Sequence, residues 1–117
     1  ELLILRQHRQ RADPLRGQHA PLETCMQGHS ASNLMPVIAA NRVGLEEVTP
    51  CEANGNQKSA LKFYGSSFIT DGAGEVIRSM DRDSEGVITA EFDLDELERE
   101  RFSWGLFRDR RPEMYHE

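Results

Sequence analysis

Short apolar runs separated by polar stretches mark the first part of the chain. Leu2 to Leu5 and Val37 to Ala40 are continuous apolar runs, typical of strands that are covered on both faces. Apolar positions at three- and four-residue steps predict a moderately amphipathic helix from Leu22 to Met35, which ends before Pro36. Residues 6–20 have no period and predict a loop. Because a helix followed at once by a buried strand is half of an α/β repeat, the pattern predicts an α/β fold.

The middle of the chain predicts a long surface loop followed by paired strands. Residues 41–60 are polar and without period, and loops of that length are usually functional or disordered. Residues 61–70 and 75–80 are joined by an Asp-Gly turn at 71–74, which predicts a hairpin. In residues 87–92 the side chains at 87, 89 and 91, which include a threonine and a glutamate, alternate with apolar side chains at 88, 90 and 92. This alternation predicts a third strand of the same meander.

A charged helix and an aromatic tail complete the predicted elements. Asp93 is the expected N-cap, with Glu96 three residues later in a capping box, so a short helix should run to about Arg101. Residues 104–117 alternate large apolar groups with arginines, which favours a tail docked on the body or on a neighbouring subunit. The arginines within 108–111 also suit a phosphate or a nucleic acid, but the aromatic side chains between them favour packing.

Composition limits the size of the core and the kind of partner. The 117 residues suffice for one domain, and the apolar share of 38% implies a modest core. The net charge of −6 and the sequence pI near 5.2 have the wrong sign for a nucleic-acid binder. No apolar run approaches the roughly 20 residues that span a bilayer. We therefore expect no nucleic-acid or membrane partner and a cytoplasmic location.

The residues that most often carry chemistry are few and scattered. Cys25 and Cys51 are the two cysteines, and their spacing indicates neither a disulfide scaffold nor a zinc site. His29 could carry a proton near neutral pH, but a packed helix histidine is the favoured interpretation. The acidic residues of 81–85 lack the glycine and glutamate spacing of a calcium loop, so a solvated turn is expected there. No metal site is predicted.

Several sequence words, in one order, resemble a known enzyme family. They are MQGHSASNLMPVIAANRVG at 26–44, FYGSSFI at 63–69, Gly-Glu at 74–75, FDLD at 92–95 and WGLFRDRRP at 104–112. These words resemble the carbon-nitrogen hydrolase (nitrilase) superfamily, in particular its N-carbamoylputrescine amidases. The match is strong from Met26 to Tyr115 and weak over the first five residues, and it corresponds to the C-terminal part of a family member.

The resemblance implies an α/β fold, namely the C-terminal portion of a four-layer α-β-β-α sandwich. Within 1–117 it implies a strand at 1–5, a divergent stretch at 6–25, a region of helix, strands and hairpin at 26–103, and a docking tail at 104–117. It also implies hydrolysis of N-carbamoylputrescine to putrescine, ammonia and carbon dioxide, as part of polyamine biosynthesis. The implied enzyme is a homo-oligomer that needs no cofactor or metal.

The family's catalytic cysteine, glutamate and lysine correspond to positions before Glu1, so no catalytic residue is assigned within the chain. Neither Cys25 nor Cys51 occupies the nucleophile position. We expect the chain alone to be inactive. The alternatives are another amidase of the superfamily, acting on a different linear carbamoyl or amide substrate, and a catalytically dead fragment that docks onto intact homologues.

The stretch before Met26 differs from the family's sequence, and we interpret the difference as the result of a shift of reading frame. When the family's Ile-Gly-Ser-Glu-Pro is encoded by the bases ATC GGC AGC GAG CC, a shift of one base gives the residues from His8 to Ala12. The family's His-Trp-Lys-Arg likewise gives the residues from Pro21 to Thr24. Our hypothesis is that residues 6–25 are an out-of-frame translation restored near Met26, and translation of the neighbouring frames of the gene tests it.

Five residues at the ends of predicted strands are candidates for a substrate pocket. Asn41 and Arg42 end the second predicted strand, where α/β proteins place ligand-facing groups. Tyr64, Gly65 and Ser67 lie in the next strand, where glycine permits close backbone approach and a hydroxyl can orient a neighbour. Structural roles remain open for all five, as a turn or an ion pair at the first two positions and as core packing at the other three.

Overall fold

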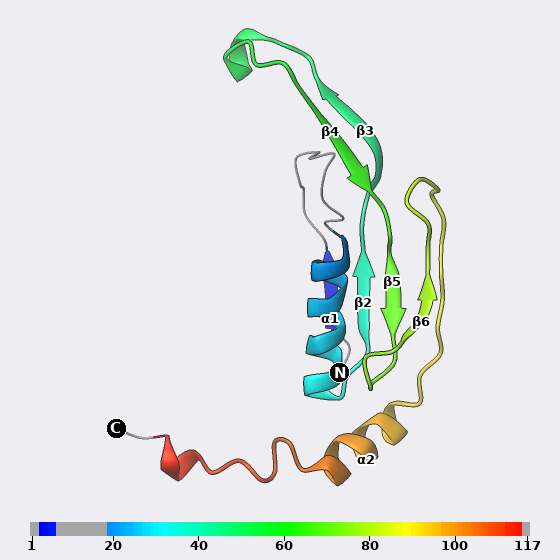
Figure 1. The fold of residues 1–117 in the computed structure, drawn as a ribbon, viewed down its shortest axis with the longest axis vertical. Helices are drawn as coiled ribbons and strands as arrows, with labels where there is room; N and C mark the ends of the chain where they lie inside the picture. Colours follow the sequence, from blue (N-terminus) through cyan, green and yellow to red (C-terminus); the bar gives the residue numbers. More distant parts are fainter. Residues whose placement is uncertain (1–2, 7–18, 116–117) are drawn as a thin grey trace.

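The computed structural model describes residues 3–6 and 19–115 (Figure 1). Its elements, in chain order, are β1 (Leu3–Arg6), α1 (His19–Asn33), β2 (Val37–Ala40), β3 (Val43–Val48), a 3-10 turn (Glu52–Asn54), β4 (Ser59–Tyr64), β5 (Phe68–Thr70), β6 (Val76–Ser79), α2 (Leu94–Trp104) and a second 3-10 turn (Pro112–Met114). The architecture is mixed α/β, as the sequence pattern predicts.

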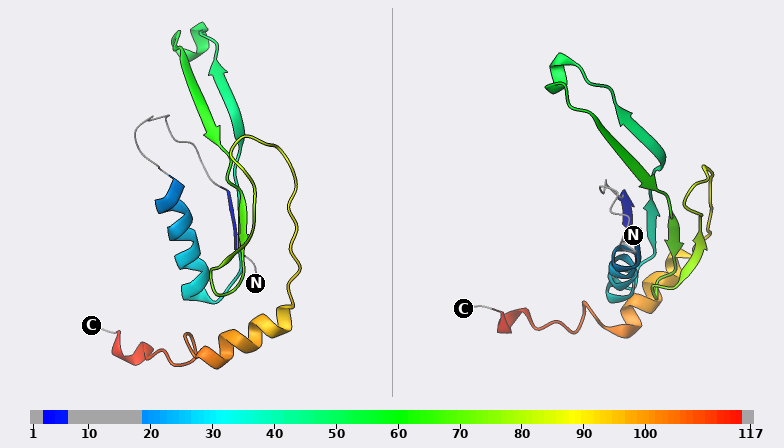
Figure 2. Two further views of the ribbon diagram at one scale, coloured as in Figure 1. Left: turned by 45° about the vertical axis from the view of Figure 1, so that its right-hand side comes forward. Right: turned by 45° about the horizontal axis from the view of Figure 1, so that its top comes forward.

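A four-stranded sheet in the order β1-β2-β5-β6 forms the body. β1 and β2 are parallel, with Leu3 opposite Val37, and the remaining pairs are antiparallel. The connection between the parallel strands includes α1, as parallel pairing requires. Figures 1 and 2 show α1 along one face of this sheet and α2 at its base. The predicted β-α-β order is confirmed.

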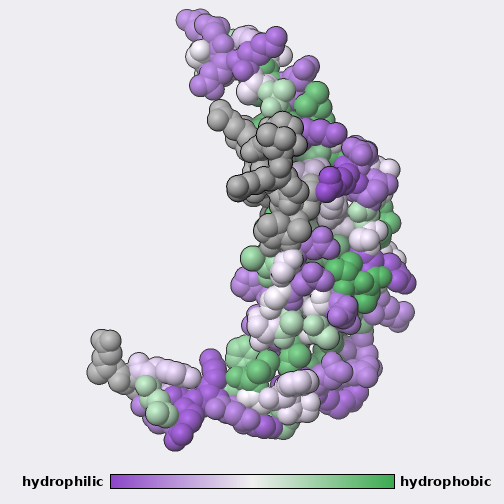
Figure 3. Space-filling model, in the orientation of Figure 1, coloured by the Kyte–Doolittle hydropathy of each residue, from purple (hydrophilic) through white to green (hydrophobic). Residues whose placement is uncertain are grey.

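The core lies between α1 and one face of the sheet. Met26 of α1 packs there with Val37 and Ala39 of β2 and Phe68 of β5, and all four are buried. Alternate residues of a strand share one face, so Val37 and Ala39 point to the helix together. In Figure 3 the hydrophobic residues gather over the body and along the strands, whereas the far end of the β3–β4 pair is hydrophilic. The core is small, as the low apolar share indicates.

The predicted loop ahead of the helix is wrong at both ends. Arg6 belongs to β1, and α1 begins at His19 rather than Leu22 and ends at Asn33 rather than Met35. Residues 7–18, which contain most of the proposed out-of-frame stretch, lie outside the described residues. Side-chain and backbone hydrogen bonds close the helix end, where the Met35 N–H donates to the Ser30 carbonyl at 3.1 Å.

The prediction of a surface loop at 41–60 is also wrong, because these residues contain most of a hairpin arm. β3 and β4 pair antiparallel from Val43 opposite Tyr64 to Val48 opposite Ser59. Figure 1 shows this arm extending beyond the four-stranded sheet. Two adjacent glutamates interrupt the apolar alternation of β3, so only its pairing with β4 reveals it as a strand.

The predicted meander is confirmed only in its turn and second strand. The run 61–70 is divided into β4 and β5 by residues 65–67, and β5 pairs with β6 across the Asp71 turn. The Asp71 carboxylate accepts backbone hydrogen bonds from Ala73 and Glu75, both at 2.9 Å. Residues 87–92 form no strand, and Val87 is 88% exposed.

The predicted capped helix is confirmed and extends further than expected. The Asp93 carboxylate accepts from the backbone N–H groups of Asp95 and Glu96, and α2 continues to Trp104 before Gly105 ends it in a left-handed conformation. The described part of the predicted tail, residues 104–115, does not dock on its own body, since Trp104 and Tyr115 are 70% and 72% exposed. Its arginines instead lie over nearby aromatic rings, as Arg110 does over Phe107. Docking on a neighbouring subunit stays a prediction.

Candidate functional site

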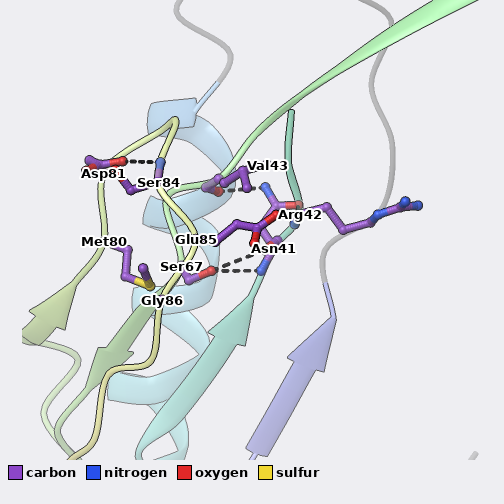
Figure 4. Close-up of a pocket in the computed structure, with 10 residues that line it drawn as sticks. Asn41, Arg42, Val43, Ser67, Met80, Asp81, Ser84, Glu85 and Gly86 are labelled. Carbon is purple, nitrogen blue, oxygen red and sulfur yellow. Dashed lines mark hydrogen bonds between the residues drawn. The ribbon is translucent and has the colours of Figure 1, made fainter. Parts of the chain in front are cut away.

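A cavity of about 320 Å³ opens at the carboxyl end of β2 (Figure 4). Its lining comes from three segments: the β2–β3 connection, the β4–β5 connection and the loop after β6. The lining residues are Asn41, Arg42, Val43, Gly65, Ser67, Met80, Asp81, Ser84, Glu85 and Gly86. β1 runs parallel to β2, so the carboxyl ends of the two strands share this edge of the sheet. Ligands of open α/β sheets bind at that edge.

Asn41 fixes the geometry of the cavity through all of its polar groups. Its backbone N–H donates to the Ser67 hydroxyl at 2.9 Å, and its side-chain amide donates to the Gly65 carbonyl at 2.7 Å. Its side-chain oxygen accepts from the Arg42 N–H at 2.9 Å. Asn41 therefore braces the β2–β3 connection against the β4–β5 connection.

Gly65 and Ser67 form the other half of this brace. Gly65 has a φ of 54°, and a Cβ there would lie 2.8 Å from the Asp81 carbonyl oxygen and 2.8 Å from a Val43 methyl carbon. Its N–H donates to the Arg42 carbonyl at 2.8 Å. The close backbone approach expected of Gly65 is thus present, and three chain segments meet at this one residue.

Arg42 and Tyr64 lie differently from their expected positions. The Arg42 backbone lines the cavity, but its side chain turns away in Figure 4, forms an ion pair with Glu46 and lies 4.5 Å from the Phe63 ring centre. Tyr64 is outside the lining and pairs with Val43 in the arm. The structure thus brings Asn41, Gly65 and Ser67 together with the Arg42 backbone. Whether any of them contacts a substrate stays a prediction.

Two acidic residues line the cavity, although the sequence pattern did not indicate them as pocket residues. Asp81 and Glu85 both line the cavity, and in Figure 4 the Glu85 side chain points from its loop toward Asn41. Their position follows from the β5–β6 hairpin, which returns the chain to the β2 edge. These acidic residues belong to a turn, as the sequence predicts. Among the described residues no three His, Cys, Asp or Glu side chains are grouped to hold a metal ion.

The Asp81 carboxylate organises this turn. It accepts from the backbone N–H groups of Asp83 at 2.9 Å and Ser84 at 2.7 Å. The hydrogen bond from the Asp83 N–H, followed by those from Ser84, lowers the pKa of Asp81 below its ordinary 3.8. The carboxylate is therefore negatively charged at neutral pH and is directed at the backbone N–H groups of its own turn.

We expect the 81–84 turn to loosen in acid. The pKa of Asp81 is lower in the folded chain, so the stabilisation that its charge provides is complete above the unfolded pKa and is lost as pH falls through the folded pKa. An NMR titration should show the Ser84 amide shifting together with the Asp81 carboxyl, below the ordinary carboxyl value. In Asp81→Asn the amide shift should lose this dependence, and its persistence there would contradict the assignment.

The remaining candidates for chemistry lie apart from the cavity. Cys25 is exposed on α1, and Cys51 is exposed at the tip of the arm. His29 is exposed on α1, so its interpretation as a packed histidine is wrong. No helix in the described part of the chain is long and apolar enough to cross a membrane.

Comparison with known proteins identifies the family. The model of the carbon-nitrogen hydrolase family matches residues 9–102. The chain belongs to the carbon-nitrogen hydrolase family. Its match begins inside the stretch that we interpret as out of frame, and that interpretation stays a hypothesis.

Relatives of two named activities resemble this hydrolase chain. A citrullinase of Francisella tularensis subsp. tularensis is 48% identical over 92 residues, which are 79% of this chain and 29% of that protein. An N-carbamoylputrescine amidase of Arabidopsis thaliana is 46% identical over 90 residues, or 77% of this chain and 29% of that protein. The chain thus spans less than a third of the length of these two relatives.

A solved structure supports the same assignment. A carbon-nitrogen hydrolase from Helicobacter pylori G27 superposes with a TM-score of 0.74 and 33% identity, over 97% of this chain and 39% of that one. This carbon-nitrogen hydrolase chain therefore has the fold of one part of a larger enzyme.

Proposed function

We propose that the chain is the C-terminal part of an amidase that hydrolyses a linear N-carbamoyl amine. The reaction converts R-NH-CO-NH₂ and one water into R-NH₂, ammonia and carbon dioxide. The observation that carries this proposal is the pair of relatives, a citrullinase and an N-carbamoylputrescine amidase, at nearly equal identity. Both named substrates have a terminal carbamoyl group on an alkyl amine, so a shared chemistry explains both similarities.

The chain contributes one wall of the substrate site in this proposal. The nucleophilic cysteine, the glutamate base and the lysine that stabilises the oxyanion come from the upstream part of the four-layer enzyme. Asn41, Gly65 and Ser67 hold the edge of β2 in place, so that a substrate at the carboxyl ends of β1 and β2 meets a fixed surface. These three residues position the site, and the upstream cysteine, glutamate and lysine act on the reacting atoms.

The charge of the cavity supports N-carbamoylputrescine as the preferred substrate. Its carbamoyl group is neutral and its free amine is protonated, so the molecule carries one positive charge. The Glu85 side chain, which points toward Asn41, places negative charge at the cavity, and this charge attracts a cation. Citrulline, the second candidate, carries a carboxylate beside its amine and gains less from this wall. The higher identity to the citrullinase is the observation that favours citrulline.

A fusion enzyme tests the activity and the substrate together. The upstream part of the Arabidopsis thaliana N-carbamoylputrescine amidase, joined to residues 26–115, should release ammonia from N-carbamoylputrescine faster than from citrulline. A second fusion with the upstream part of the Francisella citrullinase shows whether the preference follows residues 26–115. The 117-residue chain alone should release no ammonia, because we assign it no catalytic residue.

Three outcomes separate the alternatives. A folded fusion that is inactive on both compounds would overturn the carbamoyl assignment. A preference for citrulline in both fusions would transfer the assignment to the second candidate. Release of ammonia by the isolated chain, abolished when Cys25 or Cys51 is replaced, would contradict the placement of the catalytic residues upstream.

The partner that we propose for the tail is a second subunit of the same cytoplasmic enzyme. Phe102, Trp104, Phe107 and Tyr115 are exposed along α2 and the tail. Large exposed aromatic groups on one segment are typical of protein interfaces. A catalytically dead fragment that docks onto intact homologues would use the same surface. Mixing the chain with an intact relative and measuring co-elution tests this surface, because docking is expected of both roles.

A further inference from the structure

The tip of the hairpin arm contains the dipeptide Asn54-Gly55, whose chemistry is independent of the proposed hydrolase activity. A glycine nitrogen has no side chain beside it, so it can approach the preceding asparagine side chain more freely than other residues allow. Attack of the Gly55 nitrogen on the Asn54 side-chain carbon forms a carbon–nitrogen bond and a five-membered succinimide. The side-chain NH₂ group leaves as ammonia, and it takes up, through water, the proton that the Gly55 nitrogen loses. Addition of water to the ring then gives aspartate or isoaspartate.

In the folded tip, each group that this reaction needs already has a hydrogen-bond partner. The Asn54 side-chain amide donates to the Thr49 carbonyl at 2.9 Å, and its oxygen accepts from the Cys51 N–H at 3.0 Å. The Gly55 N–H, which must lose its proton, donates to the Glu52 carbonyl at 3.1 Å. Both the electrophile and the nucleophile are therefore engaged with other partners.

The product cannot restore the tip. An aspartate side chain at position 54 has no N–H to donate to the Thr49 carbonyl, and isoaspartate lengthens the backbone of residue 54 by one carbon. The new carboxylate also adds negative charge beside Glu52. Conversion thus removes the contact that joins the 3-10 turn to the end of β3.

We propose that Asn54-Gly55 is a deamidation site that the folded arm keeps closed and that, once converted, opens the arm tip. Reaction then requires local opening, and its rate reports the fraction of molecules in which the tip is open. A tip that is open in about one molecule in ten reacts about tenfold more slowly than the unfolded chain.

Peptide mapping by mass spectrometry tests the proposal. The 117-residue chain is incubated at mildly alkaline pH in buffer and in concentrated urea, and conversion of Asn54 is followed against Asn56, which precedes a bulky glutamine. We expect Asn54 to convert at least about tenfold more slowly in buffer, the ratio set by tip opening. Equal rates in the two solvents would overturn the proposal. They would mean either that the arm tip is open in buffer or that its hydrogen bonds do not protect Asn54.

A pair of variants at Cys51 separates protection by the tip from other effects. Cys51→Pro removes the N–H that holds the Asn54 oxygen, and the Cys51 φ of −149° is outside the range of proline. Its rate in buffer should approach the rate in urea. Cys51→Ala keeps the N–H and should react like the unaltered chain. Slow conversion in Cys51→Pro would also overturn the proposal.

Discussion

Replacement of Gly65 by alanine should destabilise the chain strongly. The position has a φ of 54°, and an added Cβ would lie 2.8 Å from both the Asp81 carbonyl oxygen and a Val43 methyl carbon. The left-handed backbone costs about 1–2 kcal/mol for a residue with a Cβ, and overpacking adds about 1–3 kcal/mol. Since both costs act together, we expect a loss of about 3 kcal/mol, measured as the shift of the urea midpoint by circular dichroism.

The same substitution at Gly28 is the matched control. Gly28 is exposed within α1, and no atom lies within 4 Å of the position that its Cβ would occupy. Alanine there should stabilise the chain by about 0.5–1 kcal/mol, because it restricts the unfolded chain and favours helix. Opposite signs at the two glycines are the expected result. Equal effects would show that the meeting of three segments at Gly65 does not limit stability.

The fold was predictable where a single segment carries its own signal. The apolar run at β2 and the Asp93 cap of α2 are local features, and both elements form where expected. The hairpin arm was missed because Glu46 and Glu47 interrupt the period of β3, and its strand character depends on pairing with β4. Residues 87–92 show the converse, since an alternating pattern without a hydrogen-bonded partner forms no strand.

The candidate site was predictable in position but not in the role of each residue. The end of β2 indicated Asn41, and the structure places Gly65 and Ser67 against it. Their mutual hydrogen bonds depend on two loops that meet only in the folded chain. The spacing of these residues along the sequence therefore could not predict that they brace each other. The position of Glu85 in the lining was not predicted either, because a charged turn after a hairpin is usually solvated on all sides.

Ser30→Ala should produce the second large loss of stability, although it deletes one oxygen. Ser30 is 0% exposed, and its hydroxyl lies 2.7 Å from the Met35 and Asp71 carbonyl oxygens and 2.8 Å from the Thr70 hydroxyl. Thr70 in turn accepts from the Val37 N–H at 2.9 Å. Alanine removes one hydrogen-bond partner from each of these groups, at a cost of about 1–3 kcal/mol. A urea titration of the variant measures the loss.

Ser32→Ala supplies the comparison within the same helix. Ser32 is exposed, and its hydroxyl donates to the His29 carbonyl at 3.3 Å. Both variants gain the higher helix propensity of alanine, worth up to about 0.5 kcal/mol, so their difference isolates the buried hydroxyl. A double-mutant cycle of Ser30→Ala with Thr70→Val should then give a coupling of about 0.5–3 kcal/mol, as for residues that share one network. Additive effects would mean that the two hydroxyls stabilise α1 and β5 separately.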